Sequence, residues 1–344
     1  MSRLSTSARR SEPTFERILD GALPDFASVL TWSPDGRTLA AATLAGTSHV
    51  WVGGAWAKLE GAHEGGALAV AFSPDGKTLA TTGADGHVHL HDTSSLRRAA
   101  SVRVGVDWAS CLAWAPDGAS LAAASGKRVT FLSRTGSVVA TTEHHASTVT
   151  SLAWGPEGRQ LLSTCYGGVH FLVPYKPAPL RTLPWKGSIL VAALSPDGRW
   201  IATGNQDASV HVWNIASGAD LEMSGYPTKV TAIAWAEGGP ILATGGGNSI
   251  TIWNFAGKGP AGSRPVDLTG HRKHVTGLAF AAKGDRLFSV GDDGVFHVAE
   301  RRPKWRSAFA DATESPLSSL AVTTDGRLCA AAGAGGRVVA WRVT

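Results

Sequence analysis

The chain has 344 residues, of which 43% are hydrophobic and only 17% are charged, a balance that excludes an intrinsically disordered protein. Its 32 Lys and Arg residues against 27 Asp and Glu give a net charge of +5, which is modest for this length. The 41 Gly and 13 Trp residues point to many short strands joined by tight turns.

The cysteines and the N-terminal segment bear on the cellular compartment. Cys111, Cys165 and Cys329 lie far apart in apolar runs without the short spacing of zinc ligands, which predicts reduced core thiols and a reducing compartment. Residues 1–14 are polar with scattered arginines, so we expect a disordered tail and no secretory signal. No apolar run approaches the roughly 20 residues of a membrane span. These features predict a soluble cytoplasmic protein.

The first predicted element is a strand over residues 15–20, and an eightfold repeat follows it to the end of the chain. Each repeat contains a turn that is clearest as Ser-Pro-Asp-Gly at residues 33–36, in which Pro suits the first corner and Gly a positive φ. The apolar residue before each turn recurs every 40 to 45 residues, the length of one propeller blade. These residues are Trp32, Phe72, Trp114, Trp154, Leu194, Trp235, Phe280 and Val322.

Each repeat predicts the same strands in the same order. In the second repeat an alternating strand at 68–72 enters the turn, another at 78–81 leaves it, and a third follows at 87–92. A looser fourth strand precedes the next copy. The last repeat ends after its third strand, at residues 337–342, so the strand at 15–20 supplies the missing fourth. We therefore expect the two termini to pair and close a ring.

This pattern resembles the WD-repeat β-propeller family over residues 15–344. The Trp-Asp signature survives in altered form as Trp213-Asn214, Trp253-Asn254, His91-Asp92 and Trp341-Arg342, and the Gly-His element as Gly270-His271. No repeat keeps the full Asp-His-Ser-Trp set of the family. The resemblance implies an all-β, eight-bladed propeller of four-stranded antiparallel blades; a seven-bladed ring would leave one repeat outside.

Motifs that would indicate catalysis or a cofactor are weak. The Gly-rich segment at residues 257–262 lacks the helix that a phosphate-binding loop needs. One position of the third strand is often histidine, which we interpret as neutral imidazoles packed between blades, with chelation by His87, His89 and His91 left as an alternative. The position is occupied by His49, His89, His170, His211 and His297. We predict no enzyme activity and no cofactor.

Loops of repeats five and six are the predicted docking site for a protein or peptide partner. They carry large aromatic residues beside lysines, the composition of an interface hot spot. Trp185 and Tyr226 would anchor the partner, although Trp185 could instead fold over its own blade. The other predicted contacts are Lys186 and Lys229, which would select an acidic partner, then Asn205, Gln206, Tyr166, Arg272, Lys273 and Trp108.

The same central stretch resembles a group of little-characterised bacterial WD-repeat proteins with Trp-Lys-Gly-Ser and Gly-Tyr-Pro-x-Lys-Val segments. Some of that group resemble partners of CobW-type metal-chaperone GTPases, which would imply a role in zinc supply. Cys165, His144 and His145 are then candidate metal ligands, although His145 also fits the structural histidine of the Gly-His element.

The sequence therefore favours a non-enzymatic, monomeric scaffold that binds a protein or peptide on the loop face of blades five and six. Accessory work in zinc handling is the first alternative. Nucleic-acid binding is the second alternative. It ranks last because a nucleic-acid site needs a concentrated basic stripe, whereas the densest basic cluster here, at residues 301–306, is short and the other basic residues are scattered.

Overall fold

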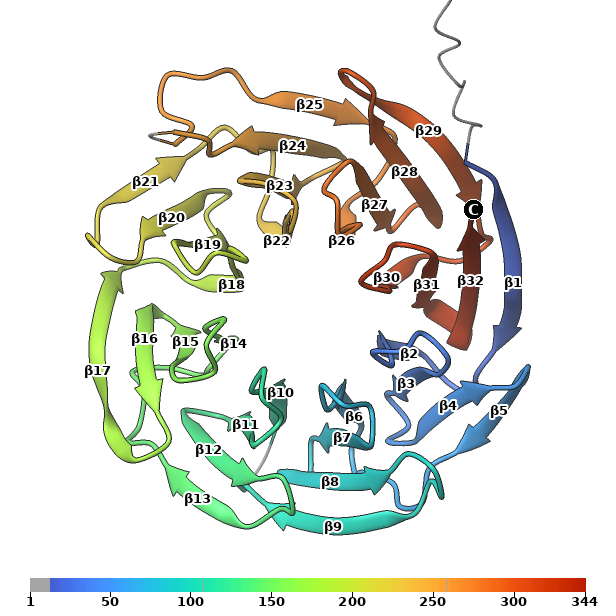
Figure 1. Ribbon diagram of the computed structural model, residues 1–344, viewed down its shortest axis with the longest axis vertical. Helices are drawn as coiled ribbons and strands as arrows, with labels where there is room; N and C mark the ends of the chain where they lie inside the picture. The colour runs from blue at the N-terminus through green and yellow to red at the C-terminus, as the bar shows by residue number, and fades with distance from the viewer. Residues whose placement is uncertain (1–12, 107, 258) are drawn as a thin grey trace, which may run out of the picture.

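The computed structural model describes residues 13–106, 108–257 and 259–344, and in these residues the strands form eight four-stranded antiparallel sheets. Figure 1 shows the sheets standing as blades around a ring, with the first strand of each nearest the centre and the fourth at the rim. The prediction of eight blades is confirmed, and the seven-bladed alternative is wrong. Residues 1–12 of the predicted tail lie outside the described residues.

The first four blades follow one another along the chain. Blade one contains β2 (Ala27–Trp32), β3 (Leu39–Thr43), β4 (Ser48–Val52) and β5 (Ala55–Lys58). Blade two contains β6 (Ala67–Phe72), β7 (Thr78–Gly83), β8 (His87–Asp92) and β9 (Arg98–Arg103). Blade three contains β10 (Ala109–Trp114), β11 (Ser120–Ser125), β12 (Arg128–Ser133) and β13 (Val138–Thr141). Blade four contains β14 (Ser151–Trp154), β15 (Leu161–Cys165), β16 (Gly167–Val173) and β17 (Lys176–Trp185).

The last four blades complete the ring. Blade five contains β18 (Ile189–Leu194), β19 (Trp200–Asn205), β20 (Val210–Asn214) and β21 (Asp220–Met223). Blade six contains β22 (Val230–Trp235), β23 (Ile241–Gly246), β24 (Ser249–Asn254) and β25 (Val266–Thr269). Blade seven contains β26 (Val275–Phe280), β27 (Arg286–Gly291), β28 (Val295–Arg301) and β29 (Trp305–Ala312). Blade eight contains β30 (Leu317–Val322), β31 (Leu328–Gly333), β32 (Arg337–Val343) and the N-terminal β1 (Phe15–Ala22), with a short 3-10 helix, η1, over Ala334–Gly336.

The repeated turn between the first and second strands has a definite hydrogen-bond chemistry. In blade one the Ser33 hydroxyl donates to Asp35 Oδ1 at 2.6 Å and accepts from the backbone N–H of Thr38 at 2.9 Å. Gly36 has φ +69°, a left-handed conformation that an L side chain disfavours. Because each side chain satisfies a backbone group of its own turn, the four-residue signal is local and is readable from the sequence.

Aromatic residues before these turns join neighbouring blades. The indole N–H groups of Trp114, Trp154 and Trp235 each donate to a carbonyl of the preceding blade, at 3.2, 2.9 and 3.0 Å. Small buried residues such as Ala40 and Ala42 on the second strands let the sheets approach one another closely. The core is therefore a series of apolar layers between blades.

The ends of the chain close the ring as predicted. β1 pairs antiparallel with β32, from Phe15 opposite Val343 to Ala22 opposite Arg337. Asp311 on β29 accepts hydrogen bonds from Arg17 of β1 at 2.6 Å and from the indole of Trp341 on β32 at 2.8 Å. This carboxylate links blades seven and eight at the closure. The described residues contain no helix long and apolar enough to cross a bilayer.

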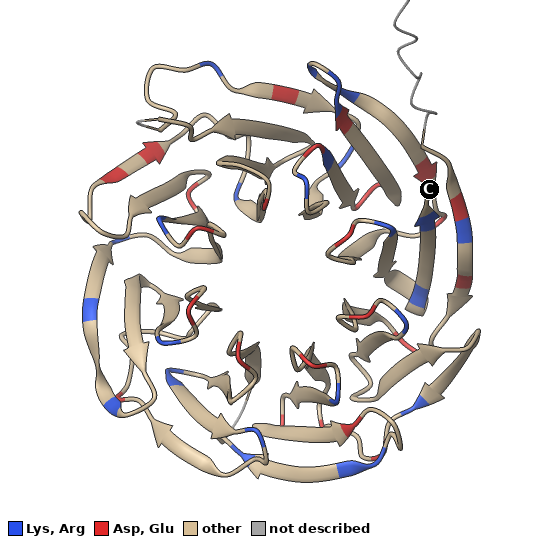
Figure 2. Cartoon of the chain, viewed as in Figure 1, with Lys and Arg blue, Asp and Glu red and all other residues tan. Residues whose placement is uncertain are grey.

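The antiparallel strands give the ring two different faces. The turn face carries the loops between first and second strands, where Figure 2 shows acidic and basic residues together in most blades. The entry face carries the loops that lead from one blade into the next, together with the turns between second and third strands. The predicted docking residues all lie on the entry face, Trp185 and Asn205 as the last residues of β17 and β19 and the others in loops.

Candidate functional site

Each blade has a buried residue at the start of its first strand, or two positions before it in blade four, and the residue four positions earlier occupies an equivalent place on the entry face. The buried residues include Ala67, Ala109 and Val230. The side chain at the preceding position differs from blade to blade, and we call this position the bracing position. From blade one to blade eight it is occupied by Leu23, His63, Gly105, His145, Trp185, Tyr226, His271 and Thr313.

In four blades the ring at the bracing position packs against the histidine of the third strand. His63 and His89 stack with centroids 4.1 Å apart, His145 and His170 meet at 4.8 Å, and His271 and His297 at 6.0 Å. In blade five Trp185 lies 4.0 Å from the ring of His211. His89, His170 and His297 therefore contact the entry loop of their own blade. His211 of blade five instead contacts Trp185, the last residue of β17 in blade four, as predicted for a ring packed between two blades.

Burial keeps these histidines neutral. It lowers the pKa of His89 to about 3 and the pKa values of His170 and His297 to about 4, because the imidazolium form loses its hydration inside a blade. A neighbouring imidazole adds to the effect in each case. Neutral rings are what the sequence predicted.

Tyr226 substitutes for the bracing histidine in blade six. Its hydroxyl lies 2.7 Å from Thr244 Oγ1 and accepts a hydrogen bond from the indole of Trp253 at 3.0 Å. Its ring lies against Gly246, where an added Cβ would come within 2.6 Å of it. Tyr226 is therefore half-buried and bound to its own blade, and only part of its ring is available to a partner.

Trp185 is held in a similar way. Besides His211 it contacts Trp213, with centroids 6.3 Å apart, in the apolar cluster between blades four and five. Its indole nitrogen is buried without a hydrogen-bond partner among the described residues. The alternative interpretation, in which Trp185 caps its own blade by folding under the loop, accounts for this packing.

The polar residues predicted beside these aromatics divide into buried and exposed side chains. Asn205 is completely buried and donates to Ser209 at 3.1 Å, so in this conformation it does not reach a partner. Gln206 is exposed. The cationic residues predicted on this face are also exposed: Lys186, Lys229, Arg272 and Lys273.

Two other predicted aromatics project from the entry face. Trp108, in the loop before β10, is 62% exposed, and Tyr166, between β15 and β16, is 52% exposed. Val106, which is not among the predicted contacts, is 74% exposed in the same loop as Trp108. The signal that separates the two kinds of aromatic is spacing, since Trp185 and Tyr226 stand at the bracing position and Trp108 and Tyr166 do not.

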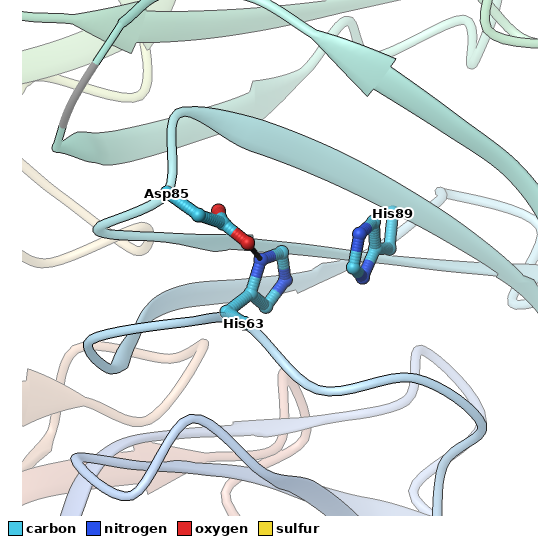
Figure 3. A group of neighbouring side chains, drawn as sticks. All are labelled: His63, Asp85 and His89. Atoms are coloured by element: carbon cyan, nitrogen blue, oxygen red, sulfur yellow. Dashed lines mark hydrogen bonds and ion pairs between the residues drawn. The ribbon is translucent and has the colours of Figure 1, made fainter.

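Blade two contains the group of side chains that most resembles a metal-binding site. Among the described residues, His63, Asp85 and His89 form the one group of three possible metal ligands whose ligand atoms all lie within 4.8 Å of one another (Figure 3). His63 already uses both nitrogens, Nδ1 with Asp85 at 3.1 Å and Nε2 with Thr81 at 2.9 Å. Its ring is stacked within 15° of parallel on His89, and lone pairs of stacked rings do not converge on one ion. Hydrogen bonding accounts for this cluster.

Blade two also holds a modified version of the family's hydrogen-bonded set. Thr81 takes the place of Ser, and His91, 3.4 Å from Thr81, takes the place of Trp. Blade seven keeps three members, with His271 between Ser289 at 2.9 Å and Asp293 at 3.1 Å. These hydroxyl–imidazole–carboxylate chains have the distances of a catalytic triad, but Ser289 is 1% exposed and no substrate reaches it.

The residues predicted as metal ligands do not form a group of that kind. Cys165 is buried, and its thiol lies 3.4 Å from His170 and 3.1 Å from the carbonyl of Tyr166. Burial raises the pKa of the Cys165 thiol, which disfavours the thiolate that zinc binds. His145 uses both nitrogens, with Lys127 O at 3.0 Å and Ser163 Oγ at 2.8 Å, and His144 is exposed.

The basic cluster at residues 301–306 is partly neutralised. Glu300, which is 4% exposed, pairs with Arg302 at 3.1 Å and with Arg286 at 3.1 Å. Part of the positive charge of the cluster is therefore neutralised within blade seven, and the cluster does not form a basic stripe.

Comparison with known protein families finds five matches to "WD domain, G-beta repeat". They cover just over half of the chain, at residues 57–92, 136–170, 178–214, 221–254 and 262–298.

Three curated relatives are eukaryotic. "Cell division cycle 20.1, cofactor of APC complex" of Arabidopsis thaliana is 32% identical over 120 residues, which are 34% of this chain and 25% of the relative. "WD repeat-containing protein slp1" of Schizosaccharomyces pombe is 25% identical over 91% of this chain and 65% of the relative. "Intraflagellar transport protein 80 homolog" of Mus musculus is 25% identical over 52% of this chain and 23% of the relative.

The chain thus spans less than two thirds of the length of each of these relatives. Their eukaryotic origin leaves the resemblance to bacterial proteins a prediction. Among solved structures, the computationally designed Ika8 protein superposes with a TM-score of 0.79 at 19% identity, covering 93% of this chain and 97% of the designed one. That likeness shows the fold alone.

Proposed function

The chain belongs to the WD-repeat family, and we propose that it is a non-enzymatic, monomeric cytoplasmic scaffold that binds a protein or peptide partner on its entry face. A relative named as a cofactor of the APC complex acts, by that name, within a larger assembly. This chain is proposed to act in the same general way, by holding a partner rather than by transforming a substrate.

The observation that carries the proposal is the exposure of large aromatic side chains on one face. Trp108 and Tyr166 project from loops of blades three and four, and neither stands at the bracing position. Trp and Tyr dominate the energetics of protein interfaces because each buries a large apolar area at little cost in side-chain entropy.

Exposed cations continue the same face toward blades five to seven. Lys186, Lys229 and Arg272 stand in successive entry loops, with Gln206 between the first two along the chain. We therefore keep blades five and six within the docking face, as a cationic arc that favours an acidic partner, and place the aromatic anchors in blades three and four.

Absence of catalysis is part of the proposal and rests on the state of the reactive groups. The triad-like chains of blades two and seven are buried, and their histidines are engaged on both nitrogens. Burial also raises the pKa of the Cys111 and Cys165 thiols, which lowers their nucleophilicity at neutral pH.

Affinity capture from the cytosol of the source organism tests the proposal. The bait is the full chain, compared with the quadruple variant Tyr166→Ala, Lys186→Ala, Lys229→Ala and Arg272→Ala. The matched control is the triple variant Arg37→Ala, Lys77→Ala and Arg199→Ala, which removes exposed cations from the turn face.

We expect one protein to be retained by the wild type and the control and lost from the entry-face variant. Equal recovery by all three baits would contradict the choice of face. Size-exclusion chromatography of the three folded proteins checks that each is monomeric.

A further inference from the structure

One hollow on the entry face differs from the rest of the ring. Three loops of blade three surround it: the loop from β9 to β10, the turn from β11 to β12 and the loop from β13 to β14. Its volume is about 1120 Å³, enough for several residues of a peptide. We call it the blade-three hollow, and its lining includes Arg103, Gly105, Val106, Trp108, Lys127 and Arg128.

The hollow exists because blade three lacks the two side chains that fill this space elsewhere. Its bracing position is Gly105, and its third-strand position, histidine in five blades, is Thr130. Both residues line the hollow. In blades two, four, five and seven a pair of rings occupies the equivalent place, as His271 and His297 do in blade seven. Among the described blades, only blade three has glycine at the bracing position; blade eight also lacks both rings but has Thr313 and Val339 there.

Trp108 lines this hollow in an unusual backbone conformation. Its φ is +44°, in the left-handed region, and its backbone N–H donates to Ala84 O at 3.0 Å. The equivalent residue of blade two is Gly66, which has φ +122°. The fold therefore carries a bulky, solvent-exposed indole where glycine would be unstrained, and strain of this kind indicates a role other than stability.

Among the described residues that line the hollow, the side chains with a full charge are all cationic. Arg103, Lys127 and Arg128 line it, and among its described lining residues there is no carboxylate. None of the three forms an ion pair with a described residue.

A second hollow of similar size, about 1080 Å³, lies on the turn face near the closure and shows the contrast. Its lining mixes Arg302 and Arg342 with Asp285, and both arginines are already paired, with Glu300 and Glu16. Among the described residues, cations without an ion pair beside exposed apolar side chains therefore distinguish the blade-three hollow.

We propose that the blade-three hollow binds an acidic peptide segment that contains a large apolar residue. The proposal rests on the scaffold function above and names its ligand chemistry. The apolar side chain packs against Trp108 and Val106, and carboxylates flanking it pair with Arg103, Lys127 and Arg128. A peptide fits better than a nucleic acid, because the cations surround one pocket with valine in its lining and do not form a stripe that follows a phosphate backbone.

Selection from a displayed random peptide library on the immobilised full chain is the test. We expect the selected peptides to be enriched in Asp and Glu around a Phe, Leu or Trp. Their fluorescein-labelled forms, titrated by fluorescence anisotropy, should bind with an affinity that falls as salt concentration rises.

Two variants separate binding from folding. Trp108→Gly removes the indole and relieves the left-handed strain, and the double variant Gly105→His/Thr130→His fills the hollow as blade seven does. Each should weaken peptide binding by about tenfold or more, with circular dichroism and thermal unfolding unchanged or improved for Trp108→Gly. Lys77→Glu on the turn face is the matched charge control and should bind as the wild type does.

Absence of acidic enrichment, or equal affinity for wild type and Trp108→Gly, would overturn the proposal. Tight binding of a labelled single-stranded oligonucleotide that depends on Trp108 would overturn it in favour of nucleic acid. If affinity capture still yields an entry-face partner while the hollow binds no peptide, the scaffold function stands and only the ligand assignment fails. Loss of both would remove the scaffold function as well.

Discussion

Blade three and blade six carry aromatic residues in the same kind of loop, but one side chain is exposed to solvent and the other is packed against its blade. Tyr226 of blade six stands at the bracing position, where Thr244 and Trp253 hold it to its own blade. Trp108 of blade three stands three residues after the bracing position, where it projects into solvent over a space that Gly105 leaves open. A shift of three residues along one loop separates an aromatic that stabilises a blade from one that is free to bind.

The largest effect should come from removing Tyr226. Tyr226→Ala deletes a half-buried ring and leaves Thr244 and Trp253 without their shared partner, so we expect a loss of about 2–4 kcal/mol in the free energy of unfolding. Urea denaturation measures it. Tyr226→Phe, which removes the hydroxyl alone, should lose about 1–2 kcal/mol. An unchanged midpoint for Tyr226→Ala would show that blade six does not depend on this side chain.

Trp185 tests whether a ring at the bracing position stabilises the fold even when it makes no hydrogen bond. Trp185→Ala removes the contacts with His211 and Trp213 and should lower the free energy of unfolding by about 2–3 kcal/mol. Trp185→Phe keeps an aromatic ring there and removes a buried N–H without a partner, so it should be close to neutral. Urea denaturation compares the two variants. If the Phe variant were as unstable as the Ala variant, the indole N–H would have to make a stabilising hydrogen bond in the folded protein.

Blade two differs from blade six in pH dependence, because its hydrogen-bonded set contains histidines. Burial, with the charge of His63, lowers the pKa of His91 to about 4, below the ordinary value of 6.5. The unfolded chain therefore takes up protons before the folded chain does as the pH falls from about 6.5 to about 4. Stability is complete above this window and should decrease by about 1–2 kcal/mol between pH 7 and pH 5 for such a histidine.

Thermal unfolding at a series of pH values measures this decrease. His91→Trp gives blade two the residue that blade six has as Trp253, and it should make the pH dependence shallower. A variant with the slope of the wild type would mean that His91 keeps its ordinary pKa.

The smallest effect on stability is expected at Trp108, and its sign is reversed. Trp108→Gly relieves a left-handed φ but adds freedom to the unfolded chain, so the free energy of unfolding should change by between zero and a gain of about 1 kcal/mol. Trp108→Ala keeps the strain and should stay within about 0.5 kcal/mol of the wild type. A loss of several kcal/mol in either variant would place Trp108 with the stabilising aromatics.

The sequence contains a signal that distinguishes the packed aromatic residues from the exposed ones. Trp185 and Tyr226 lie four residues before Ile189 and Val230, the same spacing as His63 from Ala67. That spacing, read together with the Gly-His element, indicates a structural ring. The exposure of Trp108 has no such signal, because a local pattern does not reveal which neighbouring side chains fill the space beside a loop.

The periodic part of the protein is predictable from its amino-acid sequence alone. Turns such as Ser33-Pro34-Asp35-Gly36 satisfy their own hydrogen bonds, so their spacing predicts the number of blades, and the strand at 15–20 predicts the closure by pairing with β32. The exposure of individual loop residues is instead a property of the folded ring. Exposure depends on residues brought together from separate segments, such as Gly105 of the β9–β10 loop and Thr130 of β12 beside Trp108, and spacing along the chain does not specify that contact.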